Sequence, residues 1–260
     1  MEQHFCEVYS EEIYNKMPLK GFIKLKDGSW REIAYHSIDG MVIIDGDIVL
    51  GEERKIISKD KMETEAIIFE PIRNVRWPNK TVYYEVDSAL PNKDRITEAI
   101  KEWENKTSIR FVKRSNQPNY VYFIHSTGCS SHIGMIGGRQ DIRLADNCSK
   151  GNVIHEMAHA IGLWHEQSRE DRNSYVTIYY ENIIEENKHN FDQHITDGED
   201  VGLYDYGSLM HYPRNAFSKN GKDTIVPKDP DAIIGQRNGL STKDIQALDH
   251  IYNALSVSVE

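Results

Sequence analysis

Residues 155–165 are His-Glu-Met-Ala-His-Ala-Ile-Gly-Leu-Trp-His, a pattern typical of a metal-binding helix. His155 and His159 are four positions apart, so on a helix both imidazoles project from one face and can bind one metal ion. Gly162 tolerates a positive φ, so it can end the helix and turn the chain until His165 supplies a third nitrogen. Three imidazoles with one open position are typical of a catalytic zinc site, whereas four protein ligands close a structural one. We therefore predict one catalytic Zn²⁺ ion.

Glu156 follows the first predicted ligand directly. It can reach a water molecule at the metal without being a ligand itself, so we predict that it is the general base. The other histidines considered lack metal spacing and are interpreted as structural or surface residues: His36, His125, His132, His189, His194 and His250.

The composition excludes two classes of function. The 260 residues carry 31 basic and 41 acidic side chains, a net charge of −10. A protein that neutralises phosphates needs a basic face, so we expect no nucleic-acid partner. No stretch approaches the roughly 18 apolar residues of a membrane span, so we expect no membrane partner. The first residues have neither a basic region nor an apolar one, and we expect no signal peptide in this numbering.

Sequence patterns divide the chain into short elements. Three Asp-Gly pairs in the first 50 residues predict turns between short strands, at 27–28, 39–40 and 45–46. The charged residues 51–65 are typical of an exposed linker. Later patterns predict an amphipathic helix from Asn92, strands at 81–86, 109–112, 119–124 and 141–144, and a last helix with a Ser241–Asp244 capping box. The chain is therefore predicted to be α+β.

Residues 155–165 resemble the metzincin zinc signature, and the continuation Glu166-Gln-Ser-Arg-Glu-Asp-Arg172 narrows the resemblance to the astacin family of zinc endopeptidases. Three further segments are similar to that family in the same order, namely 181–191, 204–218 and 240–245. The resemblance covers about residues 75–255 and is to a bacterial-type or minimal astacin in its pro-form. It implies a metzincin-type catalytic domain of two subdomains, with a mixed twisted sheet, a zinc helix and an active-site cleft between the subdomains.

The resemblance also implies roles for single residues. Tyr212 corresponds to an additional zinc ligand that swings away to stabilise the developing oxyanion. Met210 corresponds to the apolar floor under the metal, and Glu166 to the residue that meets the mature N-terminus after activation. Cys129 and Cys148 stand where the family has a disulfide. Closing a loop of about 20 residues is worth roughly 3 kcal/mol in the chain-entropy model.

The resemblance further implies that residues 1–68 are an inhibitory pro-segment and residues 69–260 the catalytic domain. Astacin-type pro-segments block the open zinc position with the Asp of a Gly-Asp motif, and Gly46-Asp47 matches it. Cys6 offers a thiolate, the better zinc ligand of the two. Because both cannot fill one position, we predict a cysteine switch through Cys6, with Asp47 as the alternative latent-form ligand.

The predicted function is that of a secreted, monomeric zinc endopeptidase, made as a zymogen that its own pro-segment inhibits. An edge strand within Cys129–Ile136 is expected to pair with an extended peptide, which favours polypeptide substrates. The alternatives are a zinc amidase of small peptides and a non-catalytic binding module on the same fold. The intact Glu156 and the three histidines argue against the binding module.

Overall fold

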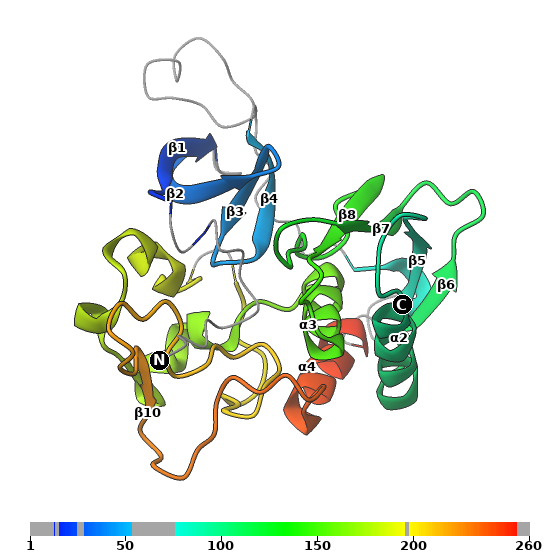
Figure 1. The fold of residues 1–260 in the computed structure, drawn as a ribbon. Helices are drawn as coiled ribbons and strands as arrows, with labels where there is room; N and C mark the ends of the chain where they lie inside the picture. Colours follow the sequence, from blue (N-terminus) through cyan, green and yellow to red (C-terminus); the bar gives the residue numbers. More distant parts are fainter. Residues whose placement is uncertain (1–12, 14–15, 25–28, 54–75, 196–197, 254–260) are drawn as a thin grey trace.

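The structure is a computed structural model that describes residues 13, 16–24, 29–53, 76–195 and 198–253 (Figure 1). Cys6, the Asp27-Gly28 turn, most of the predicted linker and the predicted domain boundary at residue 68 lie outside these residues. The predictions for them are therefore not tested by the fold.

The N-terminal part forms an antiparallel sheet in the order β1-β2-β3-β4. Its strands are β1 (Leu19–Lys24), β2 (Trp30–Ile38), β3 (Met41–Ile44) and β4 (Ile48–Glu52). Asp39-Gly40 and Asp45-Gly46 all have positive φ, between 47° and 79°. Consecutive left-handed residues close tight hairpins, and Asp, Asn and Gly adopt this conformation most readily. The two Asp-Gly turns therefore lie where the sequence predicts them.

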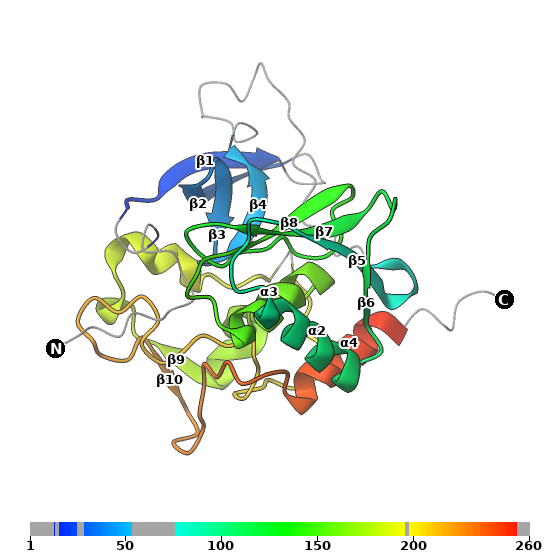
Figure 2. The same ribbon diagram turned by 45° about the vertical axis from the view of Figure 1, so that its right-hand side comes forward.

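The central sheet has the order β6-β5-β7-β8, and its pairs are all parallel. Its strands are β5 (Thr81–Val86), β6 (Arg110–Lys113), β7 (Tyr120–His125) and β8 (Arg139–Leu144). Figure 2 shows helices α2 (Asp94–Lys106) and α3 (Lys150–Ile161) on the same side of this sheet. The antiparallel part expected of a mixed sheet is the single bridge between Ser130 and Arg143. The predicted edge strand is thus reduced to isolated bridges, one to Arg143 and one from Ser131 to Ile48.

The C-terminal half is built from short elements. Strands β9 (Val176–Ile178) and β10 (Ile225–Pro227) pair antiparallel. The 3₁₀ helices are η3 (Pro78–Lys80), which precedes β5, and η4 (Glu166–Ser168), η5 (Glu170–Ser174), η6 (Tyr180–Asn182) and η7 (Glu185–Phe191). Helix α4 (Thr242–Asn253) begins with the predicted capping box, since Ser241 and Asp244 exchange two hydrogen bonds of 2.9 Å. Within the described ranges, no helix combines the length and the apolar character needed to cross a membrane.

Two apolar cores hold these parts together. The first joins the central sheet to α2, α3 and α4. The second lies in the C-terminal half and includes the buried side chains of Ile38, Ile43 and Val49 from the N-terminal sheet, packed with Phe191 and Tyr212 among others. Burying an isoleucine side chain contributes about 1.5–3 kcal/mol. The N-terminal sheet is therefore docked on the C-terminal half by an apolar contact, which fixes the β3–β4 turn over the histidines of α3.

Candidate metal centre

Helix α3 presents the first two histidines, and its two ends explain how. Ser149 caps the N-terminus and exchanges hydrogen bonds with Asn152 in a capping box. Gly162 ends the helix with φ 124°, and its N–H donates to the carbonyls of Ala158 and His159. A side chain at this φ would be strained, so glycine suits the position. The chain then turns back and brings His165 beside the ring of His155, 5.3 Å between ring centroids.

Three imidazoles and one carboxylate converge at a buried point. The ligand atoms of Asp47, His155, His159 and His165 all lie within 4.8 Å of one another. The Nε2 atoms of His155, His159 and His165 are 3.2, 3.4 and 3.2 Å from the Asp47 carboxylate. All four side chains are fully buried, with no side-chain exposure.

The hydrogen bonds on the outer side of two rings show which ring nitrogen carries a lone pair that points to the centre. Nδ1 of His155 donates to the carbonyl of Leu209 at 3.1 Å, and Nδ1 of His159 donates to that of Leu163 at 2.7 Å. The Nε2 atoms of both rings therefore carry lone pairs, because a neutral imidazole has one donor and one acceptor nitrogen. Within the described part of the chain, Nε2 of His159 and Oδ1 of Asp47 have no hydrogen-bond partner. Converging buried acceptors require a cation, and this donor set suits Zn²⁺.

The charge states agree with a cation site. Burial lowers the pKa of His155 and of His165, which keeps the rings neutral, the form that binds a metal. Burial alone would raise the pKa of Asp47, but the surrounding imidazoles hold it well below its usual range. An ionised carboxylate and a lowered imidazole pKa are both states that a bound cation favours.

Glu156 lies beside this centre on α3 and is fully buried. Neither of its carboxylate oxygens has a hydrogen-bond partner among the residues that the structure describes. Burial, followed by the charge of Asp47, raises the pKa of Glu156 well above its usual value. A buried carboxyl group with a raised pKa and free oxygens is suited to accept and return a proton.

Tyr212 is also brought to the centre. Its ring lies 4.8 Å from that of His165, and its hydroxyl donates to the carbonyl of Asp45 at 2.6 Å. The hydroxyl is thus held by the N-terminal sheet in this form of the chain. Met210 is buried in the first core, and its carbonyl accepts a hydrogen bond from the N–H of Glu166. The role of Met210 as a floor under the metal stays a prediction.

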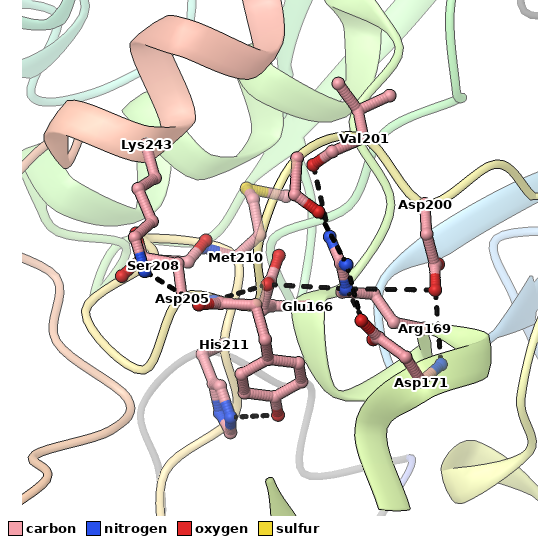
Figure 3. Close-up of polar contacts among 12 residues, drawn as sticks. Glu166, Arg169, Asp171, Asp200, Val201, Asp205, Ser208, Met210, His211 and Lys243 are labelled. Atoms are coloured by element: carbon pink, nitrogen blue, oxygen red, sulfur yellow. Dashed lines mark hydrogen bonds and ion pairs between the residues drawn. The ribbon is translucent and has the colours of Figure 1, made fainter. Parts of the chain in front are cut away.

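Glu166 lies in a cavity of about 240 Å³, lined among others by Arg76, Arg169 and Asp200. Its carboxylate accepts a 2.7 Å hydrogen bond from the N–H of Asp205 and lies 3.7 Å from Nε of Arg169 (Figure 3). Burial raises the pKa of Glu166 to about 8 in spite of these two contacts. The predicted meeting of Glu166 with the mature N-terminus stays a prediction.

Cys129 and Cys148 form a disulfide, as the resemblance implies. Both cysteines are buried. The bond connects the segment that pairs with Ile48 to the loop just before α3. It therefore ties one wall of the metal centre to the zinc helix.

The sequence pattern does not reveal two residues of this region. Asp45 and His194 are buried and hydrogen-bonded to each other, 2.5 Å from Nε2 to Oδ2. His194 lacks metal spacing, so the sequence assigns it to the surface or to a structural role, and Asp45 is hidden in a turn motif. The only signal is a second acidic residue two positions before Asp47. Cys6, the predicted latent-form ligand, lies outside the described residues.

The zinc helix, the glycine turn and the buried glutamate define the class of zinc-dependent hydrolases with a metzincin-type centre. Within that class the chain belongs to the astacin family, because residues 70–253 match the peptidase family described as "Astacin". The predicted family and α+β fold are thereby confirmed.

Named relatives agree with this assignment. The chain is 41% identical over 185 residues to zinc metalloproteinase nas-13 of Caenorhabditis elegans, a match that covers 69% of this chain and 41% of that protein. It is 43% identical over 162 residues to high choriolytic enzyme 1 of Oryzias latipes, covering 61% of this chain and 60% of that enzyme. The chain thus spans less than two thirds of the length of either relative. The solved structure of high choriolytic enzyme 1, a hatching enzyme zinc-protease, aligns with TM-score 0.62 and 38% identity over 68% of this chain and 92% of that one.

Proposed function

We propose that the chain is a zinc endopeptidase in its latent form. The observation that carries this proposal is the convergence of three imidazole Nε2 atoms beside the unpartnered, buried carboxyl group of Glu156. A bound zinc ion polarises a peptide carbonyl and lowers the pKa of a nearby water molecule. His155, His159 and His165 would hold the ion, and the carbonyls of Leu209 and Leu163 keep the rings of His155 and His159 oriented.

The chain's own side chains supply the proton transfers. Glu156 takes a proton from the attacking water and returns it to the leaving amine. Its raised pKa matches this task, because the carboxyl group must release the proton again. The hydroxyl of Tyr212 donates a hydrogen bond to the oxygen on which negative charge develops. It can do so once the carbonyl of Asp45, its present partner, has left.

Residues 1–68 act as the inhibitory pro-segment in this proposal, with Asp47 as the blocking ligand. The geometry around Asp47 supports this choice over Cys6, because its carboxylate occupies the space between the three rings. The backbone contributes as well. Val49 N–H donates to the Ser131 carbonyl at 2.8 Å, and Ser131 N–H donates to the Asp47 carbonyl at 3.0 Å. The blocker therefore also covers the main-chain groups that an extended substrate would use.

Activation would follow cleavage of the chain near residues 65–72. The family match begins at residue 70, which supports a boundary in this region. The new N-terminal ammonium group would then enter the cavity beside Glu166. The high pKa of Glu166, about 8, supports this step, since an incoming cation stabilises its ionised form.

Secretion and a monomeric state complete the proposal. The Cys129–Cys148 disulfide supports an oxidising compartment. A monomer is supported by the metal centre, whose four donors come from one chain. Polypeptide substrates are supported by the main-chain groups of Ser131, which pair with the pro-segment here and would be released for an extended peptide after activation.

The test is hydrolysis of casein and of dipeptides by the chain after its pro-segment has been removed by limited proteolysis. We expect casein cleavage that is lost on zinc chelation and recovered on zinc addition. Cleavage of dipeptides alone would support the amidase alternative, and no cleavage of either with zinc bound would support the binding module.

A further inference from the structure

Asp45, the second carboxylate of the β3–β4 turn besides Asp47, has its own hydrogen-bond partner in the C-terminal half. Nε2 of His194 donates to Oδ2 of Asp45 at 2.5 Å, and both side chains are almost fully buried, with 6% and 4% exposure. The left-handed conformation of Asp45 and Gly46 turns this carboxylate into the C-terminal half while Asp47 points at the three histidines. The turn therefore makes two separate acidic contacts.

The position of His194 is fixed by its surroundings. Its ring lies 4.0 Å from the ring of Trp164, with an interplanar angle of 35°. Its backbone N–H donates to the carbonyl of Ser168 at 2.9 Å. The imidazole is thus supported by Trp164, which precedes η4, and by Ser168, the last residue of η4. Neither residue is one of the four donors of the metal centre.

The charges around Asp45 show why it needs this partner. Asp192 lies nearby on the same segment as His194, and partial burial followed by the charge of Asp45 raises the pKa of Asp192. A buried carboxylate without a donor is strongly unfavourable. His194 supplies the donor, and His189 also lies close enough for the charge of Asp45 to act on it.

We propose that His194 and Trp164 form a carboxylate-binding recess beside the metal centre, and that Asp45 is its ligand in this chain. The recess is a second binding site for the pro-segment, and binding of Asp45 to it does not require zinc. It deepens the proposed function, because it rests on Asp47 and its neighbours being the blocker of that same cleft. The recess would bind an acidic side chain that lies two residues before the residue between the three histidines, as Asp45 lies before Asp47.

Amide hydrogen exchange in the full-length chain tests the recess without using catalytic activity. The N–H groups of Val49 and Ser131 join the blocker to the cleft wall, so their protection reports how often the turn leaves the cleft. A hydrogen bond to a buried charged group is worth roughly ten- to hundredfold in an equilibrium. We therefore expect Asp45→Asn to lower the protection of both amides by about that factor.

The partner is identified by a double-mutant cycle. His194→Phe keeps a ring against Trp164 but removes the donor, and Asp45→Asn should have less than about a threefold further effect in that background. His194→Gln keeps a donor and should retain more protection than His194→Phe. As a matched control, Asp39→Asn changes another pro-segment carboxylate, which accepts a 2.9 Å hydrogen bond from Ser126. Asp39→Asn should change protection by the same factor in the native chain and in the His194→Phe variant.

Zinc removal separates the recess from the metal-blocking contact. In the chelated chain, the coupling between Asp45→Asn and His194→Phe should persist, while Asp47→Asn should lose most of its effect on protection. Independent, multiplying effects of the two recess variants would overturn the proposal, as would a loss of their coupling on zinc removal. Unchanged protection in zinc-loaded Asp47→Asn would contradict only the blocking role of Asp47. The double-mutant cycle of Asp45 and His194 would still measure their coupling.

Discussion

Oδ1 of Asp47 lies 3.2 Å from Nε2 of His165, so a side chain from the N-terminal sheet reaches the innermost point of the catalytic half. This contact depends on the β3–β4 turn, where Asp45 and Gly46 have φ values of 47° and 79°. It depends equally on Ile43 and Val49, whose burial in the second core fixes the turn over the cleft. The position of the Asp47 carboxylate between the histidines thus depends on the docked sheet as a whole, and in the proposed latent form this carboxylate would be the contact of the sheet with the metal.

Replacing Asp47 by Asn should weaken latency. The amide is nearly isosteric but neutral, so it binds a zinc ion less tightly than a carboxylate. We expect zinc-loaded, unprocessed Asp47→Asn to hydrolyse casein at least about tenfold faster than the unprocessed native chain, since a 1.4 kcal/mol loss of binding gives that factor. The measurement is the initial rate with the pro-segment still attached, checked by electrophoresis.

Cys6→Ser is the matched control for this experiment. If Asp47 is the latent-form ligand, this variant stays latent. A leaky Cys6→Ser chain together with a fully latent Asp47→Asn chain would instead support the cysteine switch that the sequence predicts.

Replacing Glu156 by Gln should lower turnover steeply and leave zinc binding intact. The amide fills the same volume but cannot accept the proton, and a positioned general base is worth about 10²- to 10⁴-fold in rate. The processed variant should bind one zinc ion per chain and show kcat/KM for a casein-derived peptide lower by about that factor. Native-like turnover with zinc bound would remove Glu156 from the mechanism.

Local patterns predict much of the fold and of the metal centre. The i, i+4 histidines, the Gly162 turn and the Asp-Gly turns at 39–40 and 45–46 each depend on residues close in sequence, and the structure has them where they are predicted. The parallel order of the central sheet depends on long-range pairing, and the patterns do not contain it.

The prediction of the latent-form ligand, Cys6 or Asp47, is limited in the same way, because it too depends on long-range packing. Ligand chemistry favours the thiolate, whereas the contact of Asp47 with the histidines is set by how the N-terminal sheet packs on the second core. The Asp45–His194 pair joins residues 149 positions apart, and no local spacing marks it. Spacing assigns His36 and His189 to structural or surface roles, and their rings lie 5.4 Å apart between β2 and η7, a contact that spacing does not predict.

Removing the disulfide should destabilise the processed and the latent chain alike. The Cys129–Cys148 bond closes a separation of 19 residues, which corresponds to about 3 kcal/mol in the chain-entropy model. The Cys129→Ala/Cys148→Ala variant should have a free energy of unfolding lower by about that amount in urea. Added reductant should destabilise the native chain but not the variant. Equal free energies of unfolding of the two chains under oxidising conditions would show that packing alone stabilises the segment around Cys129 and Cys148.

The interface between the N-terminal sheet and η7 should weaken on acidification through His189. Burial, followed by the charge of the neighbouring His36, lowers the pKa of His189 to about 4, although Asp45 opposes the shift. In the unfolded chain the imidazole takes up a proton near pH 6.5, so between about pH 6.5 and 4 the unfolded state binds more protons. The contribution of His189 to stability is therefore fully present above pH 6.5 and is lost as the pH falls towards 4. From pH 7 to pH 5 the loss is about 1–2 kcal/mol.

His189→Asn isolates this effect, because all other titrating groups, including the metal ligands, are common to both chains. The difference in free energy of unfolding between the native chain and the variant should stay constant from pH 8 to pH 7. It should then shift in favour of the variant by about 1–2 kcal/mol at pH 5, since only the native chain has to keep a buried neutral imidazole. Urea unfolding of both chains at the three pH values measures the shift. Parallel curves down to pH 5 would mean that His189 takes up its proton in the folded chain without cost.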